Sequence, residues 1–165
     1  MKNLAIGITL AVSVLLSAGT ANAATGGATV QIVNAIGISN TVGLNFGQVI
    51  GGSGASVVTV TPGGVRTLTS GTAVLAGGTV TAASFAVTGG IGAAYTVTLP
   101  ATVGLTSGAN TLTITSVTSS PSGAAGLLDS SGAQTLLVGG VLAIPAGPAA
   151  SGIYSGTFDV TVAYN

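Results

Sequence analysis

Short runs of β-branched residues, each ended by glycine or proline, constrain this chain more than any other feature. Within a run, apolar and small polar residues alternate with a period of two, as in a strand whose successive side chains point to opposite faces. The runs are residues 55–61, 79–88, 94–99, 110–118, 134–144 and 152–165. They are divided by turn residues at intervals of roughly 10–15 residues, which is typical of an antiparallel sandwich or barrel. We therefore expect an all-β fold.

The most apolar run contains two adjacent glycines. Gly139 and Gly140 lie inside residues 134–144. Glycine weakens the interior of a strand because it has no side chain to pack and a larger entropy to lose. The pair therefore predicts a bulge, or a break between two short strands.

The last run has the clearest alternation. Its even-numbered positions carry the large side chains Tyr154, Phe158, Val160, Val162 and Tyr164. Its odd-numbered positions are small or polar and include Asp159. One face of this strand is expected to be buried, and the Asp159 carboxylate is expected to be solvated on the other.

A second alternating stretch, residues 29–38, lies near the N-terminus. Val30, Ile32, Ile36 and Ile38 share one face, interrupted only by Asn34. An apolar face of this kind must be buried somewhere. It belongs either to the first strand of the chain's own sheet or to a strand that completes another sheet, and the pattern alone does not separate the two.

Residues 1–23 have the features of a cleaved secretory signal peptide. Lys2 supplies a positive start, residues 4–16 are apolar, and Ala21-Asn22-Ala23 is a small-x-small cleavage site. We expect the mature chain to start at Ala24 and to be exported. The alternative is a membrane anchor, but the apolar run is shorter than the ~20 residues that a spanning helix needs.

Charge is almost absent, which excludes most enzymology. Charged residues make up 2% of the chain, namely Lys2, Arg66, Asp129 and Asp159, and there is no His, Cys or Trp. No histidine or cysteine is available as a base, nucleophile or metal ligand. We expect no enzyme activity, no cofactor, no metal, no small-molecule substrate and no nucleic-acid partner. Arg66 is expected to be a solvated charge, or alternatively to contact Asp129 or Asp159.

Five segments together resemble a widespread family of secreted bacterial domains of unassigned function. They are Leu44-Asn45-Phe46-Gly47, residues 61–66 (Thr-Pro-Gly-Gly-Val-Arg), residues 85–89 (Phe-Ala-Val-Thr-Gly), residues 95–100 (Tyr-Thr-Val-Thr-Leu-Pro) and the ending at residues 152–165. That family in turn resembles the chaperone–usher pilins, notably their archaic branch, which is similar to spore coat protein U. Those pilins also have an early Asn-Phe-Gly-like segment and a penultimate tyrosine, matched here by Tyr164. This chain departs from them in having no cysteine pair.

The resemblance implies an incomplete immunoglobulin-like sandwich that a strand from a neighbouring subunit completes. Residues 24–40 would then be the N-terminal extension and residues 41–165 the sandwich. Val30, Ile32, Ile36 and Ile38 would form the donor strand, and Phe158, Val160, Val162 and Tyr164 would line the acceptor groove. The partners implied are further copies of the chain, joined head to tail, with a periplasmic chaperone and an outer-membrane usher. The product would be a filament on the cell surface.

Other classes of protein remain as alternatives. The first is a monomeric secreted β-sandwich that binds carbohydrate or acts at the cell surface; against it, the six aromatic residues fall mostly on apolar faces. The second is an ice-binding solenoid, suggested by Thr-x-Thr pairs whose spacing is nevertheless irregular. The third is a transmembrane β-barrel, which would need aromatic girdles.

Overall fold

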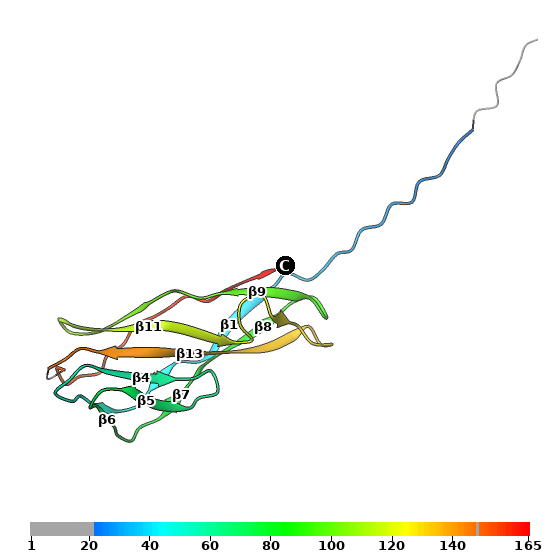
Figure 1. The fold of residues 1–165 in the computed structure, drawn as a ribbon. Helices are drawn as coiled ribbons and strands as arrows, with labels where there is room; N and C mark the ends of the chain where they lie inside the picture. Colours follow the sequence, from blue (N-terminus) through cyan, green and yellow to red (C-terminus); the bar gives the residue numbers. More distant parts are fainter. Residues whose placement is uncertain (1–21, 148) are drawn as a thin grey trace, which may run out of the picture. The chain divides into compact units, whose positions relative to one another are not determined.

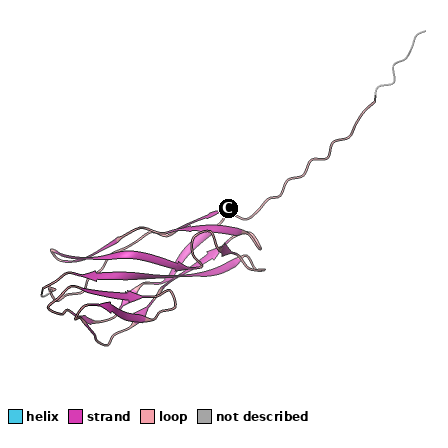
Figure 2. Ribbon diagram, viewed as in Figure 1, coloured by secondary structure: helices cyan, strands magenta, loops and turns pink. Residues whose placement is uncertain are grey.

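The computed structural model describes residues 22–147 and 149–165, and all regular structure in these ranges is β (Figure 2). The strands are β1 (Gly37–Val42), β2 (Asn45–Phe46), β3 (Val49–Ile50), β4 (Ser56–Val60), β5 (Arg66–Ser70), β6 (Val74–Leu75), β7 (Val80–Thr81), β8 (Ala83–Thr88), β9 (Ala94–Thr98), β10 (Val103–Ser107), β11 (Asn110–Ser120), β12 (Gly126–Leu127), β13 (Ala133–Ile144) and β14 (Thr161–Tyr164). No helix able to cross a membrane occurs in the described ranges. The predicted signal peptide lies outside them, apart from its last two residues.

Two antiparallel sheets form a sandwich in the domain that begins at Ile32. The larger sheet has the order β1-β8-β13-β11-β10, with the β4–β5 hairpin also attached to β13 (Figure 1). The smaller sheet has the order β12-β9-β14. Two short ladders, β2-β7 and β3-β6, complete the fold. The predicted class, an all-β antiparallel sandwich of the immunoglobulin-like type, is confirmed.

The strand β13 is continuous, so the predicted bulge or break at its glycines is wrong. Its first half pairs with β8 up to Val138, and its second half pairs with β4 from Gly140 onward. Two strands thus meet end to end along one edge of β13, and the chain leaving β4 passes directly over Gly139. A Cβ on Gly139 would collide with the carbonyl oxygen of Val60, and one on Gly140 would lie 2.8 Å from Ile114 Cγ2. The glycines provide room for a close backbone approach.

We expect Gly139→Ala to destabilise the domain by about 1–3 kcal/mol or more, because the obstructing atoms belong to backbone and cannot rotate away. Gly104→Ala is the matched control: Gly104 also lies in a strand, and nothing lies within 4 Å of an added Cβ. That substitution should be neutral or slightly stabilising. Urea unfolding of both variants measures the difference, and equal free energies of unfolding would contradict this role of Gly139.

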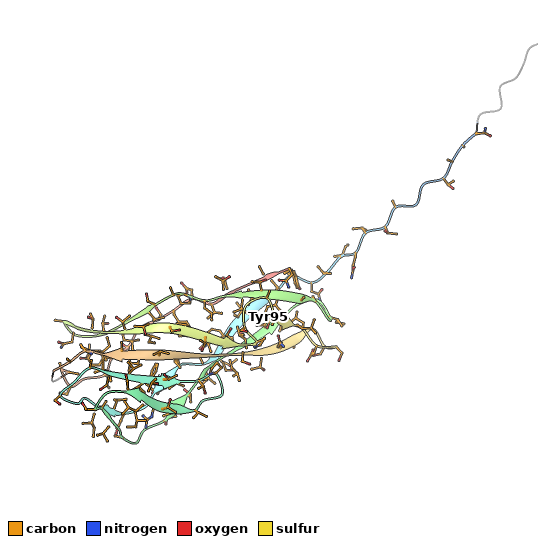
Figure 3. All side chains as sticks on the ribbon, in the orientation of Figure 1. Tyr95 is labelled. Atoms are coloured by element: carbon orange, nitrogen blue, oxygen red, sulfur yellow. The ribbon has the colours of Figure 1, made fainter. Side chains whose placement is uncertain are left out.

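The first of two hydrophobic cores fills the space between β8 and β13 on one side and β9 and β14 on the other. At its centre is Tyr95, labelled in Figure 3, which is fully buried. Its hydroxyl donates a hydrogen bond to Gln134 Oε1 at 2.6 Å, and burial raises the pKa of Tyr95. Phe85 and Phe158 meet edge to face across this core, with ring centroids 6.2 Å apart. This half of the sandwich is closed by sheet on both sides.

The second core is covered differently. Its buried residues include Phe46, Val58, Val60, Val103, Ile114, Leu142 and Ile144. One side is the larger sheet, which contributes β4, β10, β11 and β13. In the described chain, the opposite side has the two short ladders β2-β7 and β3-β6 and the chain before β14, because the strands of the smaller sheet, β12, β9 and β14, lie over the first core. The sandwich is therefore incompletely covered over its second core.

Candidate functional site

A groove of about 800 Å³ opens over this second core. Its floor is apolar and is formed by Leu105, Leu112, Ile114, Leu142 and Ile144. Its walls are two segments far apart in sequence, residues 44–51 and residues 149–156. Leu105 and Leu112 of the floor are only half-buried, although they pack against the second core. The domain thus keeps part of its hydrophobic core open to solvent.

Both walls of the groove present unpaired backbone. β2 pairs only with β7, and β3 only with β6, so each has a free edge. On the opposite wall, Ser155 exchanges both of its backbone hydrogen bonds with Thr106 of β10. In an extended chain the neighbours of such a residue direct their N–H and C=O groups to the other edge. Within the described ranges, Tyr154 and Gly156 have no backbone hydrogen bond to any strand.

These features are the requirements for accepting one more strand. Unpaired N–H and C=O groups at a strand edge form a template for pairing with another chain. An added strand gains main-chain hydrogen bonds, and every second side chain drops into the pockets below. The groove has free edges on both sides and an apolar floor between them, so a strand could pair with both walls and bury one of its faces.

The predicted acceptor residues lie beside this groove and not in it. Phe158, Val160, Val162 and Tyr164 do share one buried face, while the odd-numbered residues between them are exposed, as the alternation predicted. All four pack against the closed first core, and Phe158 also contacts the second core; the groove wall on this side is formed by residues 149–156, which precede them in the chain. Alternation predicts which side chains face inward. It does not predict which part of the core stays uncovered, because that depends on where the smaller sheet ends.

The predicted donor stretch is divided by the structure. Ile36 and Ile38 pack against the first core of their own domain, and Ile38 pairs with Val87 in the β1–β8 ladder. Val30 and Ile32 are 86% and 90% exposed and belong to no strand. Ile36 and Ile38 are thus part of the sandwich itself, and the predicted boundary between residues 40 and 41 falls inside β1. The reason is that β8 has an edge that the chain's own residues 37–42 satisfy.

Arg66 organises one wall of the groove, a role that the sequence analysis missed. Its guanidinium donates hydrogen bonds to the carbonyl oxygens of Phe46 (2.6 Å), Gln48 (3.0 Å) and Ala76 (2.5 Å). These bonds tie residues 46–48 to the adjacent segment that carries β6 and β7. Arg66 is half-buried there, neither a freely solvated charge nor the partner of an aspartate.

The Leu-Asn-Phe-Gly segment is shaped to receive this guanidinium. Gly47 adopts a positive φ of 67°, and a Cβ at that position would lie 2.6 Å from Arg66 Nη1. Asn45 Oδ1 accepts a hydrogen bond from the Gly47 N–H at 2.8 Å, which holds the turn. Two of the sequence motifs, residues 44–47 and residues 61–66, are therefore parts of one structure. The signal available in the sequence was that the single cation after residue 23 lies within such a motif.

We expect Arg66→Gln to loosen this wall and to lower the free energy of unfolding by about 1.5–3 kcal/mol, the usual contribution of hydrogen bonds to a charged group. Arg66→Lys keeps the charge but not the planar fork, so it should restore only part of the loss. Chemical unfolding measures the free energy of unfolding, and the rate of limited proteolysis within residues 43–51 measures how firmly this wall is held. If the lysine variant matched the natural chain in both measurements, the guanidinium geometry would have no role.

A carboxylate caps the turn before β13. Asp129 Oδ1 accepts hydrogen bonds from the Ser131 hydroxyl (2.6 Å), the Ser131 N–H (2.8 Å) and the Ala133 N–H (3.0 Å). The Ser131 hydroxyl, followed by the Ala133 and Ser131 amides, lowers the pKa of Asp129 below its ordinary value. The folded state therefore favours the carboxylate more than the unfolded state does.

This shift predicts a contribution to stability that is present at neutral pH and lost in acid. A lowered pKa in the folded state means that the stabilisation declines as the pH falls below about 4, the ordinary carboxyl pKa, and through the lower value of the folded protein. We expect Asp129→Asn to be less stable than the natural chain at pH 7 and to differ from it less at pH 2–3. Thermal unfolding between pH 2 and pH 7 measures this, and a constant difference across that range would contradict it.

Comparison with known proteins identifies a family. A family model described as "Domain of unknown function (DUF4402)" matches residues 36–164. No curated protein and no solved structure matches the sequence significantly. Within the part of the chain that the structure describes, no group of three or more acidic, histidine or cysteine residues is placed to hold a metal ion. The match spans the whole sandwich, from the residue before β1 to the end of β14, and the chain belongs to the DUF4402 family.

Proposed function

We propose that this protein is a non-enzymatic structural subunit that polymerises head to tail. In each contact, the segment before Ile36 of one copy enters the groove of the next copy as an additional strand. The observation that carries the proposal is the apolar groove between two free strand edges, in a chain whose exposed apolar residues Val30 and Ile32 belong to no strand.

The reach of the chain supports a partner in trans. The Tyr164 hydroxyl donates a hydrogen bond to the Asn34 carbonyl at 2.5 Å and so fixes the start of the domain. Ile32 is two residues from Asn34 and can lie at most about 7 Å away. Gly156, the groove residue closest in sequence to Tyr164, is eight residues before it, or about 26 Å along an extended chain. Val30 can lie at most about 14 Å from Asn34, little more than half of that length.

The order of the side chains in the segment sets its register in the groove. Every ladder in the domain is antiparallel, so we place the incoming strand antiparallel to residues 153–164. In the register that places Ile32 opposite Gly156, Asn34 comes opposite Tyr154, and Val30 comes opposite Phe158, where the groove meets the closed core. The smaller residues 24–28 then follow the closed half of the sandwich. Burying Val30 and Ile32 contributes roughly 3–6 kcal/mol before ordering costs, in addition to the main-chain hydrogen bonds.

A contact of this kind leads to filaments. The donor segment and the groove are different surfaces, so each copy retains one free segment and one free groove after joining a neighbour. Heterologous contacts that do not close into a ring propagate. The proposal includes export of the chain from Ala24 onward and, from the resemblance to pilins, handling by a chaperone and an usher.

Electron microscopy of the purified chain from Ala24 tests the proposed function. We expect filaments after incubation at high concentration, with a repeat set by one domain. Material that stays monomeric under all conditions, with or without removal of copurifying chaperones, would contradict the proposal and favour a self-contained secreted domain.

A further inference from the structure

The start of the domain is held at one end of the sandwich. Tyr164, whose hydroxyl binds the Asn34 carbonyl, also accepts a hydrogen bond from the Gly90 N–H at 2.6 Å. Gly90 is buried, and a Cβ there would lie 3.6 Å from Val33 Cβ. The C-terminus, marked in Figure 1, lies at this end of the domain, and the loop after β13 lies at the opposite end. Val33 and Asn34 thus belong to the end surface and not to a free linker.

Both ends of the domain carry large apolar side chains exposed to solvent. We define the anchor end as Val33, Ile91 and Leu127, which surround Gly90 and the neighbouring turn of residues 127–132. Ile91 is 74% exposed. We define the groove end as Ile50 and Ile153, one on each wall of the groove. Ile153 is 90% exposed. Solvent exposure of isolated apolar residues is ordinary, but here they gather at the two places where copies would be joined.

We infer that successive subunits touch end to end, with the anchor end of one copy packed on the groove end of the next. The inference rests on the proposed function and follows from the spacing of the chain. If Ile32 occupies a neighbour's groove while Asn34 is bound to Tyr164 of its own domain, only Val33 separates them. The two domains are then at most about 7 Å apart at the crossing point, which leaves no length for a solvated linker.

The polarity of the inserted strand selects which surfaces meet. A strand antiparallel to residues 153–164 leaves the groove past Ile153, toward the groove end. The next domain begins there with its anchor end. The joint would contain few charges: near the anchor end these are the Asp129 carboxylate, whose Oδ1 is engaged in its own turn, and the C-terminal carboxylate of Asn165. The groove end, Ile50 and Ile153, carries no charge, so no like charges repel each other across the joint.

Paired charge substitutions test the joint in the chain from Ala24. Ile91→Asp and Leu127→Asp each alter the anchor end without touching the groove, and Val65→Asp is the control, because Val65 is 59% exposed in the β4–β5 turn. We expect all three variants to unfold near the temperature of the natural chain as monomers, and all to form filaments. Filaments of the two end variants should dissociate at least tenfold faster in denaturant and bend more in micrographs than those of Val65→Asp.

Double variants test whether Ile91 of one copy contacts Ile153 of the next. Ile91→Asp with Ile153→Lys should recover part of the lost filament stability, whereas Ile91→Asp with Ile153→Asp should lose more. Equal dissociation rates for both end variants, the control and the natural chain would overturn the end-to-end joint while leaving the strand exchange intact. If the natural chain forms no filaments, the proposed function fails and the joint fails with it.

Discussion

Filament formation is expected to disappear in Ile32→Asp while the domain itself stays folded. Ile32 is 90% exposed in the single subunit, so a charge there leaves the domain's own core unchanged. In a neighbour's groove the same carboxylate would lie over Leu105 and Leu142 without a partner. Burying an unpaired charge opposes association by several kcal/mol or more, which lowers the association constant at least a thousandfold. Light scattering and electron microscopy measure assembly, and circular dichroism with thermal unfolding confirms the fold.

Gln31→Asp is the matched control for this prediction. Gln31 adjoins Ile32, and its side chain points to the opposite face of an extended segment. The same charge would then face solvent, and filaments should form at nearly the natural rate. If Gln31→Asp blocked assembly as strongly as Ile32→Asp, net charge and not burial in the groove would explain the loss. If neither variant affected filaments, the segment would not be the donor.

A chain that supplies its own strand is expected to be a more stable monomer. The C-terminus lies next to Tyr164, so a second copy of residues 24–33 joined after Asn165 by one glycine would run back antiparallel to residues 153–164. Asn165-Gly then forms the two-residue turn, and Ala24 of the appended segment pairs with Tyr164, which keeps the isoleucine opposite Gly156. Its isoleucine and valine would reach the groove of the same domain. Because the donor is then intramolecular, the groove is filled at any protein concentration. We expect the unfolding temperature to rise on the order of 10 °C, since each kcal/mol shifts it by a few degrees in a domain of this size.

The same extended chain with aspartate in place of the isoleucine of the appended segment is its control. We expect this variant to unfold near the temperature of the natural monomer and to regain the ability to polymerise through its vacant groove. Calorimetry gives the unfolding temperature, and sedimentation gives the size. A self-complemented chain with an unchanged unfolding temperature, or one that still forms filaments, would show that the groove does not take this segment.

The fold could be predicted from the sequence because its signals are local. Period-two alternation identified the inward face at Phe158, Val160, Val162 and Tyr164, and the structure buries that face. Glycine and proline bounded the runs that correspond to β4, β9, β11 and β13, whereas the run 152–165 forms a regular strand only at its end, in β14. At Gly139 the local rule failed, because those glycines serve the approach of another strand and not a turn. The strands that pair with β13 are set by the tertiary structure and cannot be read from the sequence of β13 itself.

The position of the groove could not be predicted for the same reason. Ile36 and Ile38 continue the alternation of Val30 and Ile32, so the sequence does not distinguish the two pairs. Ile36 and Ile38 belong to the chain's own sandwich because residues 37–42 pair with the edge of β8. Arg66 appeared as an isolated charge because its partners are backbone carbonyls, which every residue possesses. These carbonyls, from residues next to or within β2, β3 and β6, come together only in the folded domain.

Disulfide trapping tests strand exchange most directly, since the natural chain contains no cysteine. A chain carrying Gln31→Cys and Thr157→Cys places one thiol on the donor segment and one directly opposite it on the groove wall's strand, on the exposed face, where neighbouring strands are close enough for a disulfide. Under mild oxidation and without reductant on the gel, we expect a ladder of covalent multimers that collapses to one band on reduction, and no ladder from either single variant. An intramolecular disulfide in a monomer would show that the segment fills its own groove. Filaments that form without any cross-link between these positions would show that the subunits join in another way.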